Sequence, residues 1–279
     1  MSYSGILTID IENDELLADF YTNRTLYTAN TPDVNQYLVI RNNGKLLGPY
    51  KFKNGKWEDV PFRVFDSIHF GTIKPKDNDP YQKAYMDSLV ANDLTFCTGP
   101  GGTGKSLIAM SYAFQEFEKG HVDKIVVFTN PLIATGAVKL GFLPGTKQDK
   151  LLESSIGSIL ISKLGGEDEV RRLMDRDELV LMPMGDCRGY EVPTNAFVYF
   201  TEAQNMSPYL MKLFLQRTND SSKICVEGDV KQSDYEVFYK QSGLQKAIDV
   251  FRGEDYAGHV ELRTIYRGRI ARKAEEICD

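Results

Sequence analysis

The chain has 279 residues and a mass of 31.5 kDa, which is enough for one large domain or two small ones. Hydrophobic residues make up 42% of it and charged residues 26%, so intrinsic disorder and a coiled coil are excluded as the dominant state. A formal net charge of -6 and a pI of about 5.3 exclude bulk electrostatic attraction to nucleic acids or anionic membranes.

The sequence also argues against a membrane protein and against a disulfide-rich one. It has no apolar run of about 18 residues, and its first residues lack the basic and apolar blocks of a secretory signal. The cysteines, at positions 97, 187, 225 and 278, are widely spaced and stand apart from the histidines. A disulfide framework and a Cys/His metal site are therefore not expected. We expect a cytoplasmic protein without membrane partners.

Residues 1–78 are rich in Asn, Tyr and turn signals, which predicts a small β-rich meander with some helix. In chain order, we expect a helix near 14–23 and strands at 37–40, 45–52 and 56–58. A polar segment with two prolines, at 74–80, indicates a linker. This accessory region has no readable role. Its aromatic residues, with Trp57 among them, either form a small core or dock a neighbouring subunit or a nucleic acid strand.

From about residue 80 the pattern alternates between helices and short apolar strands. Continuous apolar strands separated by helices predict a parallel sheet that is covered by helices on both faces. Residues 136–178 show no convincing strand and indicate a helical insertion. The expected helices are at 81–91 and 105–118, and the expected strands are at 94–98, 124–129, 179–182, 197–201, 223–227 and 260–265.

The strongest functional signal is a glycine-rich run between a predicted strand and a predicted helix. It fits the pattern G-x-x-x-x-G-K-[ST] of a phosphate-binding loop. Glycines let successive backbone N–H groups point at phosphate oxygens, and the following helix adds the positive end of its dipole. A glycine-rich turn that binds nothing is the alternative. The run consists of Gly99, Pro100, Gly101, Gly102, Thr103, Gly104, Lys105 and Ser106.

Three side chains in or near this run have specific expected roles in nucleotide binding. Lys105 places its ammonium group between the β- and γ-phosphates, and Ser106 supplies a hydroxyl ligand for Mg²⁺. Gln82, on the preceding helix, is a candidate for binding the base, because an amide can pair with the donor and the acceptor of an adenine edge. The alternative for Gln82 is an exposed helix glutamine.

A second group of candidates follows the predicted strand at 197–201. A P-loop ATPase needs an acidic residue at the end of a neighbouring strand to hold the metal and orient water. Glu202 is the candidate base that activates water, and a plain surface carboxylate is the alternative. Thr201 stands where such enzymes usually carry aspartate. Its hydroxyl is able to hold a metal-bound water but adds no negative charge, so weaker metal affinity is expected.

The strand predicted at 223–227 leads to a third group. Asp229 and Gln232 are expected at the carboxyl edge of the sheet, where open α/β sheets bind ligands. The amide of Gln232 is suited to sensing the γ-phosphate, and a simple strand-to-loop turn is the alternative. Near the C-terminus, arginines at 263, 267, 269 and 272 offer an arginine finger or, as the alternative, form a solvated helix.

From about residue 74 to its end, the chain resembles the PhoH-like proteins, in particular the stand-alone form common in phages. Its phosphate loop is similar to the family loop, and residues 139–145 (KLGFLPG) resemble the more specific G-F-L-P-G segment. Residues 201–205 (TEAQN) are similar to the D-E-A-Q-N strand end. Asp229 with Gln232 and then residues 242–244 match later blocks in order, and Arg267 stands where the family has a late arginine.

The chain departs from this family pattern at two positions. Thr201 replaces the usual aspartate, and Asn130 stands where the family commonly has arginine. Both departures bear on hydrolysis more than on nucleotide binding. Some family members also carry a ribonuclease domain of the PIN type, but residues 1–78 are too short for one, so no nuclease activity is expected.

The resemblance implies an α/β fold for residues 79–279: a RecA-like P-loop NTPase domain with a parallel sheet flanked by helices, related to superfamily 1 helicases. It implies Mg²⁺-dependent binding and hydrolysis of ATP, coupled to remodelling or unwinding of RNA or DNA by a hexameric ring. A phage-encoded chain would act in the cytoplasm of the host cell. The implied catalytic residues are Lys105, Glu202, Gln232 and Arg267, and the implied metal ligands are Ser106 and Thr201.

Two other classes of function are compatible with the loop. Thr201 and Asn130 favour an ATP-gated binding or scaffold module with little or no turnover. A small nucleotide kinase also shares the loop, but it would need an Arg-rich lid over the acceptor site, to which no segment of the sequence corresponds convincingly.

Overall fold

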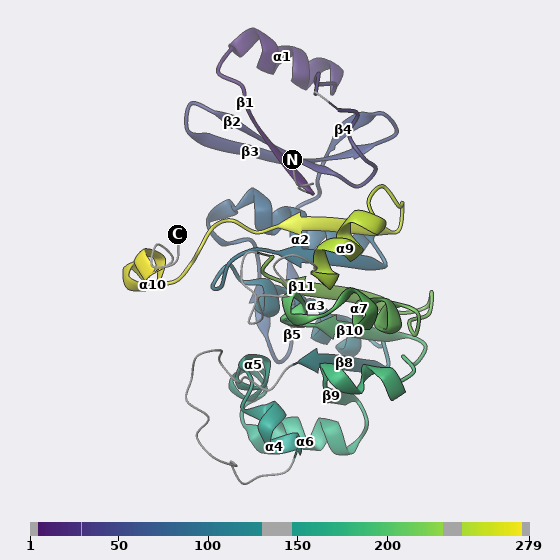
Figure 1. The fold of residues 1–279 in the computed structure, drawn as a ribbon. Helices are drawn as coiled ribbons and strands as arrows, with labels where there is room; N and C mark the ends of the chain where they lie inside the picture. Colours follow the sequence, from purple (N-terminus) through teal and green to yellow (C-terminus); the bar gives the residue numbers. More distant parts are fainter. Residues whose placement is uncertain (1–4, 29, 130–146, 231–241, 275–279) are drawn as a thin grey trace. The chain divides into compact units, whose positions relative to one another are not determined.

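The computed structural model describes residues 5–28, 30–129, 147–230 and 242–274 (Figure 1). The chain divides into two compact units. The first comprises Met1–Val64, Lys74–Lys105 and Phe251–Asp279, and the second comprises Phe65–Ile73 and Ser106–Val250. Because this division follows packing and not chain order, the domain boundary expected between residues 78 and 79 stays a prediction.

The first unit contains a four-stranded sheet with the order β1-β2-β3-β4. Strands β2 (Tyr37–Asn42), β3 (Lys45–Lys53) and β4 (Lys56–Asp59) are antiparallel neighbours, as predicted. Strand β1 (Ile6–Asp10) pairs in parallel with β2, and α1 (Asp14–Asn23) connects the two. The prediction of a simple meander is wrong for β1, because a parallel pair needs a crossover connection and leaves no hairpin signal in the sequence.

Helix α1 closes one face of this sheet. Asn13 caps its first turn, since the Asn13 side chain accepts hydrogen bonds from the backbone N–H groups of Glu15 and Leu16 at 2.8 and 3.3 Å. One turn before the helix ends, Phe20 is fully buried and meets the ring of Tyr50 edge-on, with centroids 4.9 Å apart.

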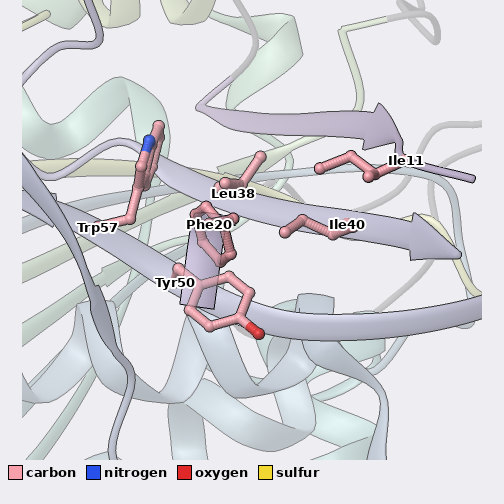
Figure 2. Close-up of a cluster of buried hydrophobic side chains, with 6 residues drawn as sticks. All are labelled: Ile11, Phe20, Leu38, Ile40, Tyr50 and Trp57. Carbon is pink, nitrogen blue, oxygen red and sulfur yellow. The ribbon is translucent and has the colours of Figure 1, made fainter. Parts of the chain in front are cut away.

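Figure 2 shows the hydrophobic core that results from this packing. Trp57, from β4, is only 1% exposed. The tryptophan is therefore a core residue and is not available to dock a subunit or a nucleic acid. The buried members of the core are Ile11, Phe20, Leu38, Ile40, Tyr50 and Trp57.

The first unit also contains the strand that precedes the phosphate loop, with its parallel neighbour. Strand β7 (Leu94–Thr98) pairs in parallel with β12 (Ala257–Glu261), and the helices are α2 (Pro80–Ala91) and α10 (Arg269–Ala274). The helix predicted at 81–91 and the strand predicted at 94–98 are confirmed. The strand predicted at 260–265 instead begins and ends earlier.

Polar contacts explain why the position of β12 was not readable from apolar residues. His259 is buried within the strand, and its Nδ1 accepts a hydrogen bond from the backbone N–H of Gly5 at 3.1 Å. Its Nε2 lies 2.9 Å from the hydroxyl of Thr98 on β7. A strand stabilised through a histidine gives no continuous apolar run in the sequence.

A buried carboxylate joins α2 to the four-stranded sheet. Asp87 is 3% exposed, accepts a hydrogen bond from the hydroxyl of Tyr37 at 3.0 Å, and lies 3.2 Å from Arg63 and 3.6 Å from Lys51. Burial, followed by the charge of Asp87, raises the pKa of Tyr37, so the phenol stays protonated as a donor. The accessory sheet and α2 are thus held together by a buried charge cluster.

The second unit contains four strands in the order β11-β10-β8-β9, and all neighbouring pairs are parallel. They are β8 (Lys124–Thr129), β9 (Leu179–Pro183), β10 (Ala196–Phe200) and β11 (Lys223–Gly228). Each lies within a residue of its predicted position. The expected α/β fold with a parallel sheet flanked by helices is confirmed.

The helices of the second unit include the one that follows the phosphate loop and the expected insertion. Over residues 147–178, the insertion is confirmed as helical without a strand, and its remaining residues lie outside the described ones. Within the described ranges, no helix has the length and apolar character needed to span a bilayer. The helices are α3 (Lys105–Glu118), α4 (Lys147–Leu152), α5 (Ser155–Leu164), α6 (Glu167–Asp175), α7 (Pro208–Leu215) and α9 (Gly243–Val250), and a small hairpin is formed by β5 (Phe65–Ser67) and β6 (Gly71–Ile73).

Replacing Asp87 by alanine tests the buried charge cluster. The change leaves Lys51 and Arg63 without their carboxylate, and we expect the free energy of unfolding to fall by about 3 kcal/mol. Denaturant unfolding measures the loss. Asp10→Ala is the matched control, because Asp10 pairs with Arg41 at an exposed position and should cost less than about 1 kcal/mol. Equal losses of unfolding free energy in both variants would contradict a stabilising role of the buried charge cluster around Asp87.

Candidate phosphate and metal site

The phosphate loop lies between β7 and α3 and curls around its own lysine. The Nζ of Lys105 donates hydrogen bonds to the carbonyl oxygens of Gly99 and Pro100 at 2.7 and 3.0 Å. The hydroxyl of Thr103 donates to the same carbonyl of Pro100 at 3.0 Å. The loop thus brings an ammonium group to the start of a helix, which is the combination of charge and backbone N–H groups that binds phosphates.

The segment after β12 covers the glycine turn of the loop. The backbone N–H of Tyr266 donates to the carbonyl of Gly102 at 2.9 Å. Gly102 has a φ of 78°, and a Cβ atom there would lie 2.5 Å from Cγ of Arg267. A Cβ on Gly101 would lie 3.5 Å from Nη1 of Arg267. The structure therefore brings the predicted arginine finger onto the phosphate loop of its own chain.

The side chain of Gln82 contacts the backbone of the phosphate loop directly. Its Nε2 donates to the carbonyl oxygen of Thr103 at 2.9 Å, and its Oε1 accepts from the backbone N–H of Lys76 at 2.8 Å. The residue is 5% exposed, so it is not the exposed glutamine of the alternative interpretation. With both amide atoms engaged, Gln82 supports the loop, and its binding of adenine stays a prediction.

The segment at 74–80 is not the free linker that its prolines indicated. It forms a short 3-10 helix (Lys76–Asn78), and Asp79 then caps α2 by accepting from the backbone N–H of Tyr81 at 2.8 Å. The hydroxyl of Tyr266 donates to Asp79 at 2.8 Å. Burial, followed by the hydrogen bond to Asp79, raises the pKa of Tyr266. This segment is therefore part of the support of the phosphate loop.

In the second unit, the serine that follows Lys105 contacts a buried carboxylate. The hydroxyl of Ser106 lies 3.1 and 3.2 Å from the two carboxylate oxygens of Glu227, which is 3% exposed. The hydroxyl of Thr201 donates to Glu227 at 3.2 Å, and the hydroxyl of Tyr199 also donates to Glu227. Burial, followed by the charge of Glu227, raises the pKa of Tyr199 and keeps it a donor.

These residues fit a magnesium ion by their chemistry. Hydroxyl and carboxylate oxygens are the hard ligands that Mg²⁺ prefers, and one or two carboxylates with substrate phosphates suffice for it. The described residues contain no group of three His, Cys, Asp or Glu side chains able to hold a metal alone. Ser106, Thr201 and Glu227 would hold the ion, which would neutralise phosphate charge when bound.

The predicted base, Glu202, follows β10 but makes a different contact. It has a left-handed backbone conformation with φ 59°, and its Oε2 accepts a hydrogen bond from Nε2 of Gln204 at 2.7 Å. The Oε1 of Gln204 in turn accepts from the backbone N–H of Asp229 at 3.1 Å. Glu202 and the predicted Asp229 are thus connected through one amide side chain.

The remaining predicted residues lie outside the described part of the chain. These are Gln232, the predicted sensor of the γ-phosphate, Asn130, and the segment at 139–145 that carries the family resemblance. Their proposed roles stay predictions.

Two residues of the site were not predicted from the sequence. Glu227 was read as the last residue of a buried strand, and Tyr266 was not singled out. For Glu227 a signal existed: a carboxylate ends an apolar strand in a chain whose neighbouring strand has Thr201 where a carboxylate is usual. For Tyr266 no local pattern indicates the contact with Asp79, which is far away in the sequence.

Replacing Gln82 by leucine tests whether this residue stabilises the phosphate loop or binds the adenine base. Leucine is similar in size but leaves the buried carbonyl of Thr103 and the N–H of Lys76 unpaired, so the free energy of unfolding should fall by about 2 to 4 kcal/mol. Gln245→Leu is the control, because the side chain of Gln245 bonds the exposed Asp249, and its loss should change stability by about 0.5 kcal/mol or less. An unchanged unfolding free energy in Gln82→Leu would favour a residue devoted to the base.

Comparison with solved structures finds helicase domains at low similarity. The Hef helicase domain of Pyrococcus furiosus matches with a TM-score of 0.36 and 14% identity over 65% of this chain and 37% of the other. The Pif1 helicase of Candida albicans has the same TM-score and identity, over 71% and 42%. At these scores the likenesses carry no argument about function.

Curated relatives match more strongly. The PhoH-like protein of Bacillus subtilis (strain 168) is 36% identical over 187 residues, which cover 65% of this chain and 56% of the relative. The PhoH-like protein of Mycobacterium tuberculosis (strain ATCC 25618 / H37Rv) is 34% identical over 200 residues, with 70% and 54% covered. The chain spans about half the length of the curated relatives it matches. These relatives are bacterial, so the phage origin implied by the resemblance finds no support in them.

The family model described as PhoH-like protein matches residues 72–279. This range begins just before the segment that supports the phosphate loop. It includes the loop itself, Glu202, Glu227 and the arginine that covers the glycine turn. The chain therefore belongs to the PhoH-like protein family and carries the phosphate loop of a P-loop NTPase.

Proposed function

We propose that this protein is a cytoplasmic, Mg²⁺-dependent ATPase. The observation that carries the proposal is the pair of consecutive residues at the end of the phosphate loop. Lys105 holds its ammonium group on the loop carbonyls, and the hydroxyl of Ser106 contacts the buried carboxylate of Glu227. P-loop NTPases use these two positions for phosphates and for Mg²⁺, respectively. Membership in the PhoH-like family supports the same chemistry.

The other residues have distinct parts in this proposal. Backbone N–H groups of the loop bind the phosphates, and Arg267, which already lies over the glycine turn, stabilises the charge on the transferred phosphoryl group. Asp229 and Gln232 complete the nucleotide site. Magnesium, when bound, supplies charge neutralisation at the phosphates.

Glu202 acts as the general base. Water attacks the γ-phosphorus, its proton passes to a carboxylate oxygen of Glu202, and ADP leaves with the electrons of the broken P–O bond. The hydrogen bond from Gln204 to Oε2 fixes the orientation of the carboxylate, so Oε1 is the candidate proton acceptor.

The alternative is an ATP-gated binding module with little turnover. It is favoured by Thr201, which adds no charge beside Ser106, and by the contact of Glu202 with Gln204. The same nucleotide would then order a binding surface without being hydrolysed at a useful rate.

Nucleotide binding and phosphate release by three variants distinguish these functions. Lys105→Ala should weaken ATP binding by about 10- to 100-fold, because it removes a charge-assisted contact. Glu202→Gln should keep ATP binding and lower phosphate release by about 100-fold or more. Lys124→Ala, which removes a partly buried lysine paired with the exposed Asp177, should change neither property. Background-level phosphate release by the wild type, together with intact ATP binding, would leave only the binding module.

We further propose that the protein assembles into a ring of identical subunits, hexameric by resemblance, that acts on RNA or DNA. The net charge of -6 requires that any such contact use a local basic groove. Sedimentation with ATP, Mg²⁺ and a single-stranded oligonucleotide should reveal a complex several times the mass of the chain, and the oligonucleotide should stimulate phosphate release. A monomer that is insensitive to RNA and DNA would refute this extension.

A further inference from the structure

The position of the acidic residue beside the phosphate-loop serine differs from the sequence expectation. P-loop NTPases hold Mg²⁺ between this serine or threonine and an aspartate at the end of a neighbouring strand. In this chain that aspartate position, directly after β10, is Thr201. The carboxylate that contacts Ser106 comes instead from Glu227 on β11.

Strand register explains how a residue of β11 reaches the same place. Tyr199 of β10 pairs with Cys225 of β11, and Phe200 pairs with Val226. Continuing this register by one residue places Glu227 beside Thr201, and alternation along the strands puts Tyr199, Thr201 and Glu227 on one face of the sheet. The two positions are therefore lateral neighbours at the carboxyl edge.

Within the described part of the chain, a third hydroxyl at this edge has no hydrogen-bond partner. Thr129 ends β8, which pairs with β10 through Phe128 and Phe200, so Thr129 continues the row beside Thr201. It is 1% exposed, and its Oγ1 has no hydrogen-bond partner among the described residues. A buried hydroxyl is normally hydrogen-bonded, so an unpartnered one in this row indicates a missing polar ligand. A metal-bound water is such a ligand.

We propose that Glu227 anchors the Mg²⁺ ion in this chain, performing from β11 the part that an aspartate at position 201 would perform from β10. The inference rests on the proposed function. The hydroxyl of Ser106 donates a hydrogen bond to Glu227, which leaves its oxygen lone pairs available to the cation. Thr201 and Thr129 contribute hydroxyls on the same face, and phosphates and waters complete the coordination.

Tyr199 is a positioning residue for this site. Its ring is fully buried, and its hydroxyl donates to the Glu227 carboxylate from the side of β10. The hydrogen bond fixes the carboxylate within reach of Ser106. Hydroxyl groups of Ser106, Tyr199 and Thr201 thus converge on one buried carboxylate, and they hold its two oxygens at the edge of the sheet where the cation would bind.

The test measures how much Mg²⁺ strengthens ADP binding, which does not depend on hydrolysis. Calorimetric titrations with ADP are made in Mg²⁺ and in EDTA, and electron paramagnetic resonance counts Mn²⁺ bound in the presence of ADP. Glu227→Gln should reduce the strengthening by Mg²⁺ at least 10-fold and leave ADP affinity in EDTA within about 3-fold of the wild type. The substitution is isosteric and keeps the contacts with the hydroxyls sterically possible.

A double variant tests the exchange of roles between the strands. Thr201→Asp combined with Glu227→Gln returns one carboxylate to the row and should recover most of the Mn²⁺ binding and of the strengthening by Mg²⁺. The double variant also replaces Glu227→Gln in the test if that single variant is too unstable to measure. In that case the measured quantity is the Mn²⁺ binding of the folded double variant. A folded double variant without metal binding overturns the exchange.

Glu202→Gln completes the set, because Glu202 is the other carboxylate after β10. It should leave the strengthening by Mg²⁺ unchanged. Loss of the strengthening in Glu202→Gln, or its persistence in Glu227→Gln, overturns the assignment of Glu227. A wild-type chain that binds neither ADP nor ATP under any condition refutes the proposed function itself, so the two failures are distinguishable.

Discussion

Burial of the Glu227 carboxylate is the constraint on which the second unit depends. A buried carboxylate is costly unless hydrogen bonds compensate for lost water. Here hydroxyls from Ser106, Tyr199 and Thr201 supply that compensation, and they come from α3 and β10. Because each donor must reach the same two oxygens, the first turn of α3 and the ends of β10 and β11 are fixed relative to one another. The need of the Glu227 carboxylate for hydrogen bonds thus determines how these three elements meet at the carboxyl edge of the sheet.

The phosphate loop is held by a different principle, through its backbone. Gln82 engages the carbonyl of Thr103, and the N–H of Tyr266 engages that of Gly102. Such contacts do not depend on the side chains of the loop, which are then free to be glycine where the chain curls. The residues that support the loop come from the segment before α2, from the first turn of α2 and from the segment after β12. The sequence indicated a linker for the first of these segments, at 74–80, and a strand for residues 260–265, so neither was expected to support the loop.

Local patterns in the sequence predicted most of the fold but little of how distant residues meet. The helix at 14–23, the phosphate loop and the strands before Lys105 and Glu202 each have a signal within a few residues. Strand β1 and its parallel partner do not, because their pairing crosses a helix. The bounds of β12 were not predicted correctly, because the buried polar residue His259 interrupts the apolar run of that strand. Glu227 was likewise not predicted as a site residue, because its contacts are made with residues of α3 and of the neighbouring strand, which are distant in the sequence.

The exchange between positions 201 and 227 has a consequence for interpreting the family pattern. A motif compared position by position assigns the metal carboxylate to one strand, so Thr201 alone suggests a weakened site. In a parallel sheet, however, residues at the same register on adjacent strands are only about 5 Å apart, and either can present a carboxylate to the same ion. Thr201 is then no evidence against turnover, because its hydroxyl holds the carboxylate that replaces the missing one. The case for a binding module therefore depends on Glu202 and not on Thr201.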